Sequence, residues 1–171
     1  MDTETTGLGD DAEIVEIAVV DSQGSIVFAS LVRPSRPIPP EASDIHGITN
    51  AAVADAPGFA QLWAAELKGV LRTAPHVAIY NADYDVRLIT QSLGRRQRQR
   101  GSRSWAGVTC IMDLYAQFWG EWHDYFQSYT WQKLEVAAYQ CGLDWEGDAH
   151  RALADAKMSL KVLEFMAAFR Q

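Results

Sequence analysis

Two runs rich in β-branched residues, joined by a short polar turn, form the clearest hydrophobic pattern near the start of the chain. In "EIVEIAVVDSQGSIVFASLVRP" these runs flank "DSQG", a four-residue turn that ends in glycine. This pattern predicts a β-hairpin. The following stretch, "RPSRPIPPEASDIHGIT", contains four prolines, so we expect it to cross the surface as an ordered loop without regular structure.

Helical and extended patterns alternate through the rest of the chain. "PGFAQLWAAELKGVLRTA" has a helical apolar period and a proline near its start, so it predicts a helix. "HVAIY" is typical of a short buried strand, and "DYDVRLITQSLG" of a helix with Gly94 as its stop signal. Three later segments predict a short strand with a helix, an amphipathic helix and a final helix: "GVTCIMDLYAQFW", "WQKLEVAAYQCGL" and "AHRALADAKMSLKVLEFMAAFRQ". Strands that alternate with helices after a hairpin indicate an α/β fold with a mixed sheet flanked by helices.

Length and composition narrow the class of protein. A chain of 171 residues is long enough to bury a core, and we expect a single domain over residues 1–171. No apolar run approaches the roughly 18 residues that span a bilayer, and no signal peptide precedes Asp2, so we expect no membrane association. Cys110 and Cys141 lie far apart without metal-ligand spacing. They indicate reduced thiols in a cytoplasmic protein rather than a disulfide or a zinc site.

The charge of the chain is acidic overall but locally basic. The formal net charge of −7 argues against binding of nucleic acid through bulk positive charge. In "RRQRQRGSR", however, five arginines fall within nine residues. An acidic body with one basic segment suits a protein that concentrates carboxylates in a site and binds phosphates elsewhere. A solvated loop between two helices explains the segment equally well.

Two acids separated by one residue open the chain in "DTETTGL". On an extended strand Asp2 and Glu4 project to the same face, where they repel each other unless a cation or a shared proton lies between them. The small, hydroxylated and glycine-bearing residues that follow suit a backbone that must approach a ligand closely. Taken alone, the pair is also common in solvated loops, so its meaning depends on its partners.

Two later segments supply those partners. "YNADYDVRLI" places Asp83 and Asp85 just after a predicted strand, where α/β proteins build their sites. "HRALADA" places His150 five residues before Asp155. Because five residues of a continuous helix turn about 500°, the two side chains would diverge, so we expect His150 in the loop and Asp155 inside the helix. Asp155 lies among alanines, and an acid buried there is costly without a cation.

Together, "DTETTGL", "NADYD" and "HRALADA", in this order, resemble the three exonuclease motifs of the DEDDh 3′–5′ exonuclease superfamily. The intervening "IVEIAVVD" and "LVRPSRPIPPEASDIHGIT" are similar to the exodeoxyribonuclease X group, and the epsilon proofreading subunit of bacterial DNA polymerase III belongs to the same superfamily. The likeness covers nearly the whole chain. It implies a ribonuclease H-like α/β fold, whose first strand we expect to be shortened because only Met1 precedes Asp2.

The resemblance implies a metal site and a general base. The four metal-site acids would be Asp2, Glu4, Asp85 and Asp155, and the catalytic base would be His150. The implied cofactor is Mg²⁺ or Mn²⁺, two ions per site, since hard cations prefer oxygen ligands and a pair of them can stabilise both ends of an in-line phosphodiester hydrolysis. A histidine can accept the proton of the attacking water near neutral pH.

Further positions would contact the substrate. Leu8 and the "DIHGIT" loop around His46 correspond to positions that line the pocket for the terminal nucleotide, although His46 could equally stabilise its own loop. Beside a nuclease site, the arginine-rich segment is favoured as a phosphate contact. The full set of expected substrate-binding residues is Thr5, Leu8, His46, Asn81, Arg95, Arg96 and Arg98.

The expected function is that of a metal-dependent 3′–5′ exonuclease, with DNA favoured, which releases nucleoside 5′-monophosphates in repair or proofreading. Its expected partner is nucleic acid with a free 3′ end, foremost single-stranded DNA. Two alternatives stay open: an exoribonuclease that trims RNA 3′ ends, and a weakly active domain that serves as an interaction module for a polymerase or another nucleic-acid protein.

An aromatic segment stands apart from these motifs. "FWGEWHDYFQSYTW" holds seven aromatic residues in fourteen. We interpret it as core or as a homodimer contact, in preference to a platform on which unpaired bases stack.

Overall fold

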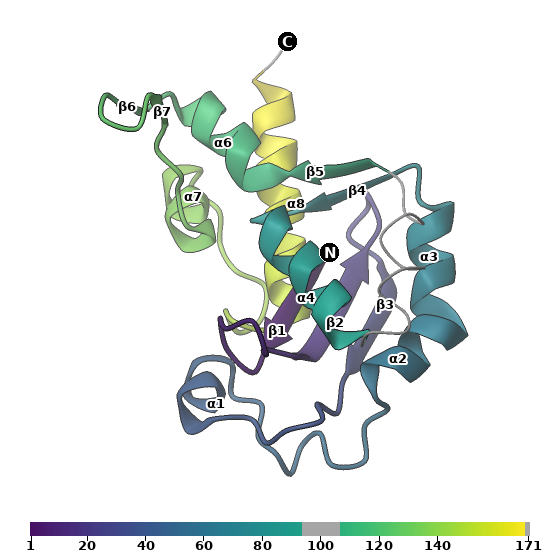
Figure 1. Ribbon diagram of the computed structural model, residues 1–171. Coiled ribbons are helices and arrows are strands. Elements are labelled where there is room, and N and C mark those ends of the chain that lie inside the picture. Colours follow the sequence, from purple (N-terminus) through teal and green to yellow (C-terminus); the bar gives the residue numbers. More distant parts are fainter. Residues whose placement is uncertain (94–106, 170–171) are drawn as a thin grey trace.

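The computed structural model describes residues 1–93 and 107–169, and it has the α/β organisation that the sequence predicts (Figure 1). The first part of the chain forms β1 (Asp2–Thr5), β2 (Ile14–Val20), β3 (Ile26–Leu31), α1 (Pro40–His46), α2 (Phe59–Leu62), η1 (Trp63–Leu67), α3 (Lys68–Thr73), β4 (His76–Ile79) and α4 (Ala82–Ser92). The second part forms β5 (Gly107–Cys110), α6 (Ile111–Trp119), β6 (Trp122–His123), β7 (Ser128–Tyr129), α7 (Leu134–Gln140) and α8 (Ala152–Ala168).

The strands form small sheets, of which the first carries the acids. The predicted hairpin is confirmed, because β2 and β3 pair antiparallel, and the amides of Gln23 and Ser25 donate to Oδ1 of Asp21 in the turn at 2.8 and 2.9 Å. β1 pairs antiparallel with the other edge of β2. β4 and β5 pair in parallel, as expected of strands joined by a connection that contains a helix. The terminal ammonium of Met1 donates to the carbonyl oxygen of Ala78 at 3.1 Å and so links β1 to β4.

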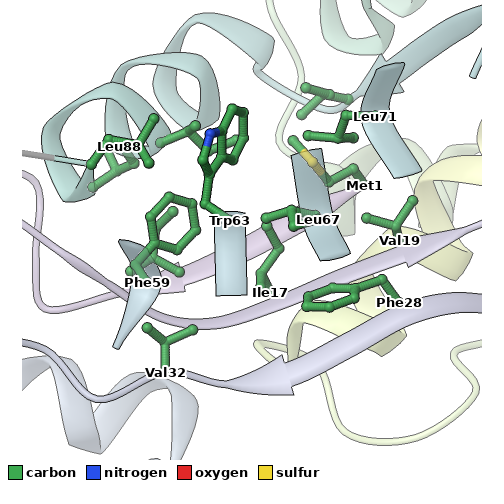
Figure 2. Close-up of a cluster of buried hydrophobic side chains, with 14 of the residues drawn as sticks. Met1, Ile17, Val19, Phe28, Val32, Phe59, Trp63, Leu67, Leu71 and Leu88 are labelled. Carbon is green, nitrogen blue, oxygen red and sulfur yellow. The ribbon is translucent and has the colours of Figure 1, made fainter. Parts of the chain in front are cut away.

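Helices cover both faces of the three-stranded sheet. On one face α8 packs against β1 and β2, and α6 and α7 pack in turn against α8. On the other face the side chains of Phe59, Trp63 and Leu67 pack over those of Ile17 and Phe28 (Figure 2). The sheet is therefore held between two layers, and α8 is fixed across the strand that bears the first two acids. None of the helices within the described ranges is long and apolar enough to cross a membrane.

The helix predicted over residues 57–74 is present, but η1 interrupts its α-helical geometry with a π turn. The buried residues Phe59, Trp63, Leu67 and Leu71 recur every four positions. An α-helix repeats every 3.6 residues, so such a row drifts around the helix. A wider π turn in the middle counters the drift and keeps the row directed at the core.

The expectation that the proline-rich stretch has no regular structure is wrong, because residues 40–46 form α1. Pro39 has extended backbone angles, φ −63° and ψ 149°, and Pro40 opens the helix, where the missing amide proton costs nothing. Gly47 ends it at φ 70°, and its amide donates to the carbonyl oxygen of Ser43 at 2.8 Å. Two of the four prolines, Pro39 and Pro40, thus stand at the start of a helix.

Phe118 packs against a buried cluster, but the rest of the aromatic segment is largely exposed, which corrects the interpretation of the whole segment as core. Residues 122–129 form a small β6–β7 hairpin, and Figure 1 shows it at one extremity of the molecule, beside α6 and α7. Tyr125, Phe126 and Trp131 are 85%, 68% and 67% exposed. The homodimer contact and the base-stacking platform stay predictions.

Candidate metal centre and nucleotide pocket

β1 presents two carboxylates on one face of the sheet. Because side chains alternate along a strand, Asp2 and Glu4 project toward α8, whereas Thr3 and Thr5 project to the opposite face. The strand register places Glu4 opposite Glu16 of β2, so these two side chains share that face. The face under α8 therefore carries a concentration of negative charge.

α8 adds a third carboxylate to those of β1. Asp155 lies in the first turn of α8, and single carboxylate oxygens of Asp2, Glu4 and Asp155 all lie within 4.8 Å of one another. Oδ1 of Asp155 is buried and has no hydrogen-bond partner within the described residues. A buried carboxylate oxygen without a partner is costly unless a proton or a cation lies beside it. The structure thus brings together three of the four predicted metal-site acids.

Burial and crowding shift the titration of these acids. Burial, followed by repulsion from Asp155 and Glu16, raises the pKa of Glu4 to about 8. Burial also raises the pKa of Asp155 to about 6. For Asp2, burial and then the negative charges of Asp85, Asp155 and Glu4 raise the pKa well above its ordinary value. Near neutral pH the cluster therefore needs protons or cations to offset its charge.

The donor set fits a hard divalent cation. All three side chains offer carboxylate oxygens, the ligands that Mg²⁺ and Mn²⁺ prefer. The unpartnered Oδ1 of Asp155 is an oxygen that such a cation could satisfy. A cation would also offset the burial that raises the pKa values of all three acids, and the repulsion that adds to it at Asp2 and Glu4.

Asp85 approaches β1 from the other side. It lies in the first turn of α4, is 3% exposed, and accepts a hydrogen bond of 2.7 Å from the hydroxyl of Thr3. Burial raises its pKa, although the bond from Thr3 opposes the shift. Since Thr3 faces away from Asp2 and Glu4, Asp85 does not join the cluster of three, but its charge is near enough to raise the pKa of Asp2.

His150 lies where the spacing predicted it, in the loop before α8. Its backbone is left-handed at φ 60°, a conformation that is uncommon for residues other than glycine. The side chain is 45% exposed, and its Nε2 lies 3.6 Å from Oε1 of Glu135 on α7. Its charge also acts on Asp155, whose pKa it lowers against the effect of burial. His150 therefore stands at the solvent side of the acids, oriented by α7.

A pocket of about 490 Å³ opens beside Glu4 and contains several of the predicted substrate residues. Thr5, Leu8 and His46 line it, together with Ile45 of α1. Leu8 and Ile45 are 81% and 61% exposed, so they present apolar surface to anything that enters. α1, which the sequence did not predict, thus forms one wall.

His46 is held by the backbone on both sides of its ring. The Ile48 amide donates to Nδ1 at 3.0 Å, so Nε2 carries the proton and donates to the carbonyl oxygen of Thr5 at 3.2 Å. The ring is buried, and burial lowers its pKa. His46 therefore ties α1 to the end of β1, which favours the loop-stabilising interpretation.

Tyr84 lines the pocket but is not among the expected substrate-binding residues. Its hydroxyl lies 2.7 Å from that of Thr5 and donates to the carbonyl oxygen of Gly7 at 2.8 Å. Gly7 has φ 145°, which L side chains rarely adopt. Arg87 donates to the carbonyl oxygen of Leu8 at 3.2 Å and fixes the same loop from α4. The signal in the sequence was the position of Tyr84 directly before Asp85.

Asn81 is not among the residues that line the pocket beside Glu4. Asn81 precedes α4 in a left-handed conformation, φ 57°, which asparagine tolerates well, and it is exposed. Arg95, Arg96 and Arg98 lie outside the described residues.

Residues 1–163 match the family model described as Exonuclease. A protein of Escherichia phage 186 named "Uncharacterized exonuclease CP81" is 44% identical over 170 residues, which cover 98% of this chain and 86% of that protein. Exodeoxyribonuclease 10 of Escherichia coli K12 is 32% identical over 165 residues, covering 95% and 65% of the two chains. The DNA polymerase III subunit epsilon of Treponema pallidum is 31% identical over 179 residues, covering 98% and 74%.

A solved exonuclease structure also resembles this chain in its fold. Exonuclease X in complex with 5′-overhanging duplex DNA matches the fold with a TM-score of 0.70 and 29% identity, over 99% of this chain and 91% of that one. The resemblance inferred from the three motifs is confirmed, as is the ribonuclease H-like α/β fold that it implied.

Proposed function

We propose, from the premise that this chain belongs to the exonuclease family, that it is a 3′–5′ exonuclease which releases nucleoside 5′-monophosphates from single-stranded DNA. The observation that carries the proposal is the cluster of Asp2, Glu4 and Asp155, with its unpartnered buried oxygen. The names of exodeoxyribonuclease 10 and of the exonuclease X–DNA complex support DNA as the substrate.

The cofactor would be two Mg²⁺ or Mn²⁺ ions. Asp2, Glu4 and Asp155 would hold them through carboxylate oxygens, and Asp85, which lies outside that cluster, would add its charge from α4, directly or through water. When bound, such ions neutralise charge on the phosphate and lower the pKa of a coordinated water. The chain supplies the oxygens and fixes their directions, because β1 is paired along β2 and α8 is packed across both strands.

His150 would accept the proton of the attacking water. It lies in the loop before α8, its charge acts on Asp155, and its ring is not part of the carboxylate cluster. Glu135 lies 3.6 Å away and would stabilise the protonated ring that results. The partial exposure of His150 would then let the proton pass to solvent.

The pocket beside Glu4 would hold the 3′-terminal nucleotide. The apolar surface of Leu8 and Ile45 suits the face of a base, and the pocket adjoins the cluster through Glu4. Arg95, Arg96 and Arg98 stay predicted phosphate contacts, and a homodimer or a polymerase partner also stays a prediction.

Labelled oligonucleotides test the proposed polarity and sugar preference. In Mg²⁺ or Mn²⁺, a 5′-labelled single-stranded DNA should shorten stepwise, whereas a 3′ label should leave at once as a mononucleotide. RNA of the same sequence should be hydrolysed at least about tenfold more slowly than the DNA. EDTA should stop the hydrolysis of both substrates.

The Glu4→Gln variant, purified identically, controls for contaminating nuclease and should be inactive. Early release of a 5′ label would contradict the direction of hydrolysis. Faster hydrolysis of RNA would favour the exoribonuclease instead.

A further inference from the structure

Glu16 is an acid in the middle of an otherwise apolar strand, β2, and its side chain is only 13% exposed. Its carboxylate accepts three hydrogen bonds from the start of α8. Nη2 of Arg151 donates to Oε1 at 2.6 Å, Nε of Arg151 donates to Oε2 at 3.1 Å, and the Ala152 amide donates to Oε2 at 2.9 Å. A single side chain of the sheet therefore holds the N-terminal end of α8.

These bonds keep Glu16 apart from the carboxylate cluster, although it lies beside it. Glu16 and Glu4 are register partners on adjacent strands, and their side chains share one face of the sheet. Glu16 is nevertheless not a member of the cluster, because both of its oxygens are directed at the helix end. Glu16 acts on the helix and not as a further ligand.

The end of α8 that Glu16 holds is one turn from Asp155. The Asp155 amide donates to the carbonyl oxygen of Arg151 at 3.0 Å, which is the bond of a single helical turn. Residues four apart share a helix face, so the face that directs Arg151 at Glu16 also directs Asp155 at β1. A rotation or withdrawal of this helix end would carry the Asp155 carboxylate with it.

We propose that Glu16 is a positioning residue for the metal site, which sets the distance between Asp155 and the carboxylates of β1 by fixing the start of α8 on β2. The inference rests on the proposed function, since it concerns the same site. A bidentate carboxylate–guanidinium pair, combined with a hydrogen bond from a helix amide, restrains both the rotation of the helix end and its distance from β2. Residues that orient metal ligands in this manner change metal affinity or activity by about 10–100-fold when replaced.

Glu16→Gln tests the role, because glutamine keeps the size and one acceptor oxygen but loses the charge that holds the guanidinium. The Kd for Mn²⁺, measured by calorimetry without substrate, should rise about 10–100-fold, because binding becomes weaker. The kcat for single-stranded DNA at limiting Mn²⁺ should fall by a similar factor, while KM for DNA stays within about twofold of the parent value. Excess Mn²⁺ should restore most of the rate.

Arg151→Gln separates position from charge. If electrostatics alone mattered, removal of a positive charge beside the cluster would tighten Mn²⁺ binding. Loss of the pair that holds α8 should instead weaken it, and weaker binding is the expected result. Tighter or unchanged binding would overturn the positioning role.

Glu146→Gln is the matched control, since it removes an ion pair from a position further along α8. Glu146 lies 2.8 Å from Nζ of Lys161 and 3.7 Å from Nζ of Lys157. The Kd for Mn²⁺ should not change in this variant. Near-UV circular dichroism identical to that of the parent shows that each variant keeps its fold.

Two kinds of failure can be told apart. If the parent protein binds no Mn²⁺, the proposed function itself fails. If the parent binds Mn²⁺ and hydrolyses DNA, but Glu16→Gln matches Glu146→Gln in Mn²⁺ affinity, Glu16 supports only the fold. The positioning role would then be wrong, whatever the change in melting temperature.

Discussion

Replacing Asp155 by alanine is expected to slow DNA hydrolysis at least about 10³-fold, because metal ions supply several kcal/mol of transition-state stabilisation and each 1.36 kcal/mol is tenfold in rate. The same change should weaken Mn²⁺ binding, since Asp155 is one of three clustered carboxylates. It should also raise the melting temperature of the metal-free protein at pH 8, because a buried oxygen without a partner is removed. Rates, calorimetry and thermal unfolding measure the three effects.

Two further variants sharpen this test. Asp155→Asn keeps the size of the side chain and should lose activity almost as completely. Glu164→Gln removes an exposed acid of the same helix and should leave activity and Mn²⁺ affinity unchanged. Activity of Asp155→Ala within about tenfold of the parent would mean that this carboxylate is not a ligand.

The pH dependence of the metal-free fold follows from the same cluster. The pKa values of Glu4 and Asp155, about 8 and about 6 in the folded protein, exceed the roughly 4 of an unfolded chain. Between these limits the folded state binds more protons than the unfolded state, so its free energy of unfolding falls as pH rises. The stabilisation that the folded state gains from protonated Glu4 and Asp155 is complete below about pH 4 and is lost by about pH 8. Mn²⁺ should therefore raise the melting temperature of the parent more at pH 8 than at pH 5, and Asp155→Ala should reduce that difference.

Replacing His150 by alanine is expected to lower kcat about 10²–10⁴-fold, the usual contribution of a general base, while Mn²⁺ binding survives. The reason is geometric, since His150 lies outside the group formed by Asp2, Glu4 and Asp155. Its partial exposure predicts that added imidazole restores part of the rate in His150→Ala and none in Asp155→Ala. His123→Ala, which changes an exposed histidine of β6, should match the parent. If His150→Ala loses Mn²⁺ as severely as Asp155→Ala, His150 is a ligand or a structural residue.

The spacing of acids within single elements was readable from the sequence, because periodicity is a local property. The alternation of Asp2 and Glu4 predicted a shared face, and the five-residue step from His150 to Asp155 predicted a loop residue followed by a helical one. The structure places all four accordingly. The family motifs then indicated which segments, distant in the sequence, come together in the fold.

Features that depend on contacts between distant segments could not be predicted from the sequence. The bond between Glu16 and Arg151 joins residues 135 positions apart, and nothing in the local pattern marks either as a partner of the other. α1 was missed because a proline breaks a helix interior but begins a helix well. The exposure of Tyr125 and Phe126 was missed because aromatic content does not tell whether a short hairpin packs on the body of the protein.

A sulfur substitution at the scissile phosphate tests most directly whether this cluster performs metal-dependent hydrolysis. A single-stranded DNA whose last linkage carries sulfur in place of one non-bridging oxygen binds Mg²⁺ poorly, whereas softer Mn²⁺ tolerates sulfur better. One of the two phosphorothioate isomers should be hydrolysed at least about tenfold more slowly than normal DNA in Mg²⁺, and Mn²⁺ should restore most of that loss. An equal loss in both metals, for both isomers, would contradict direct contact between a bound metal ion and the reacting phosphate.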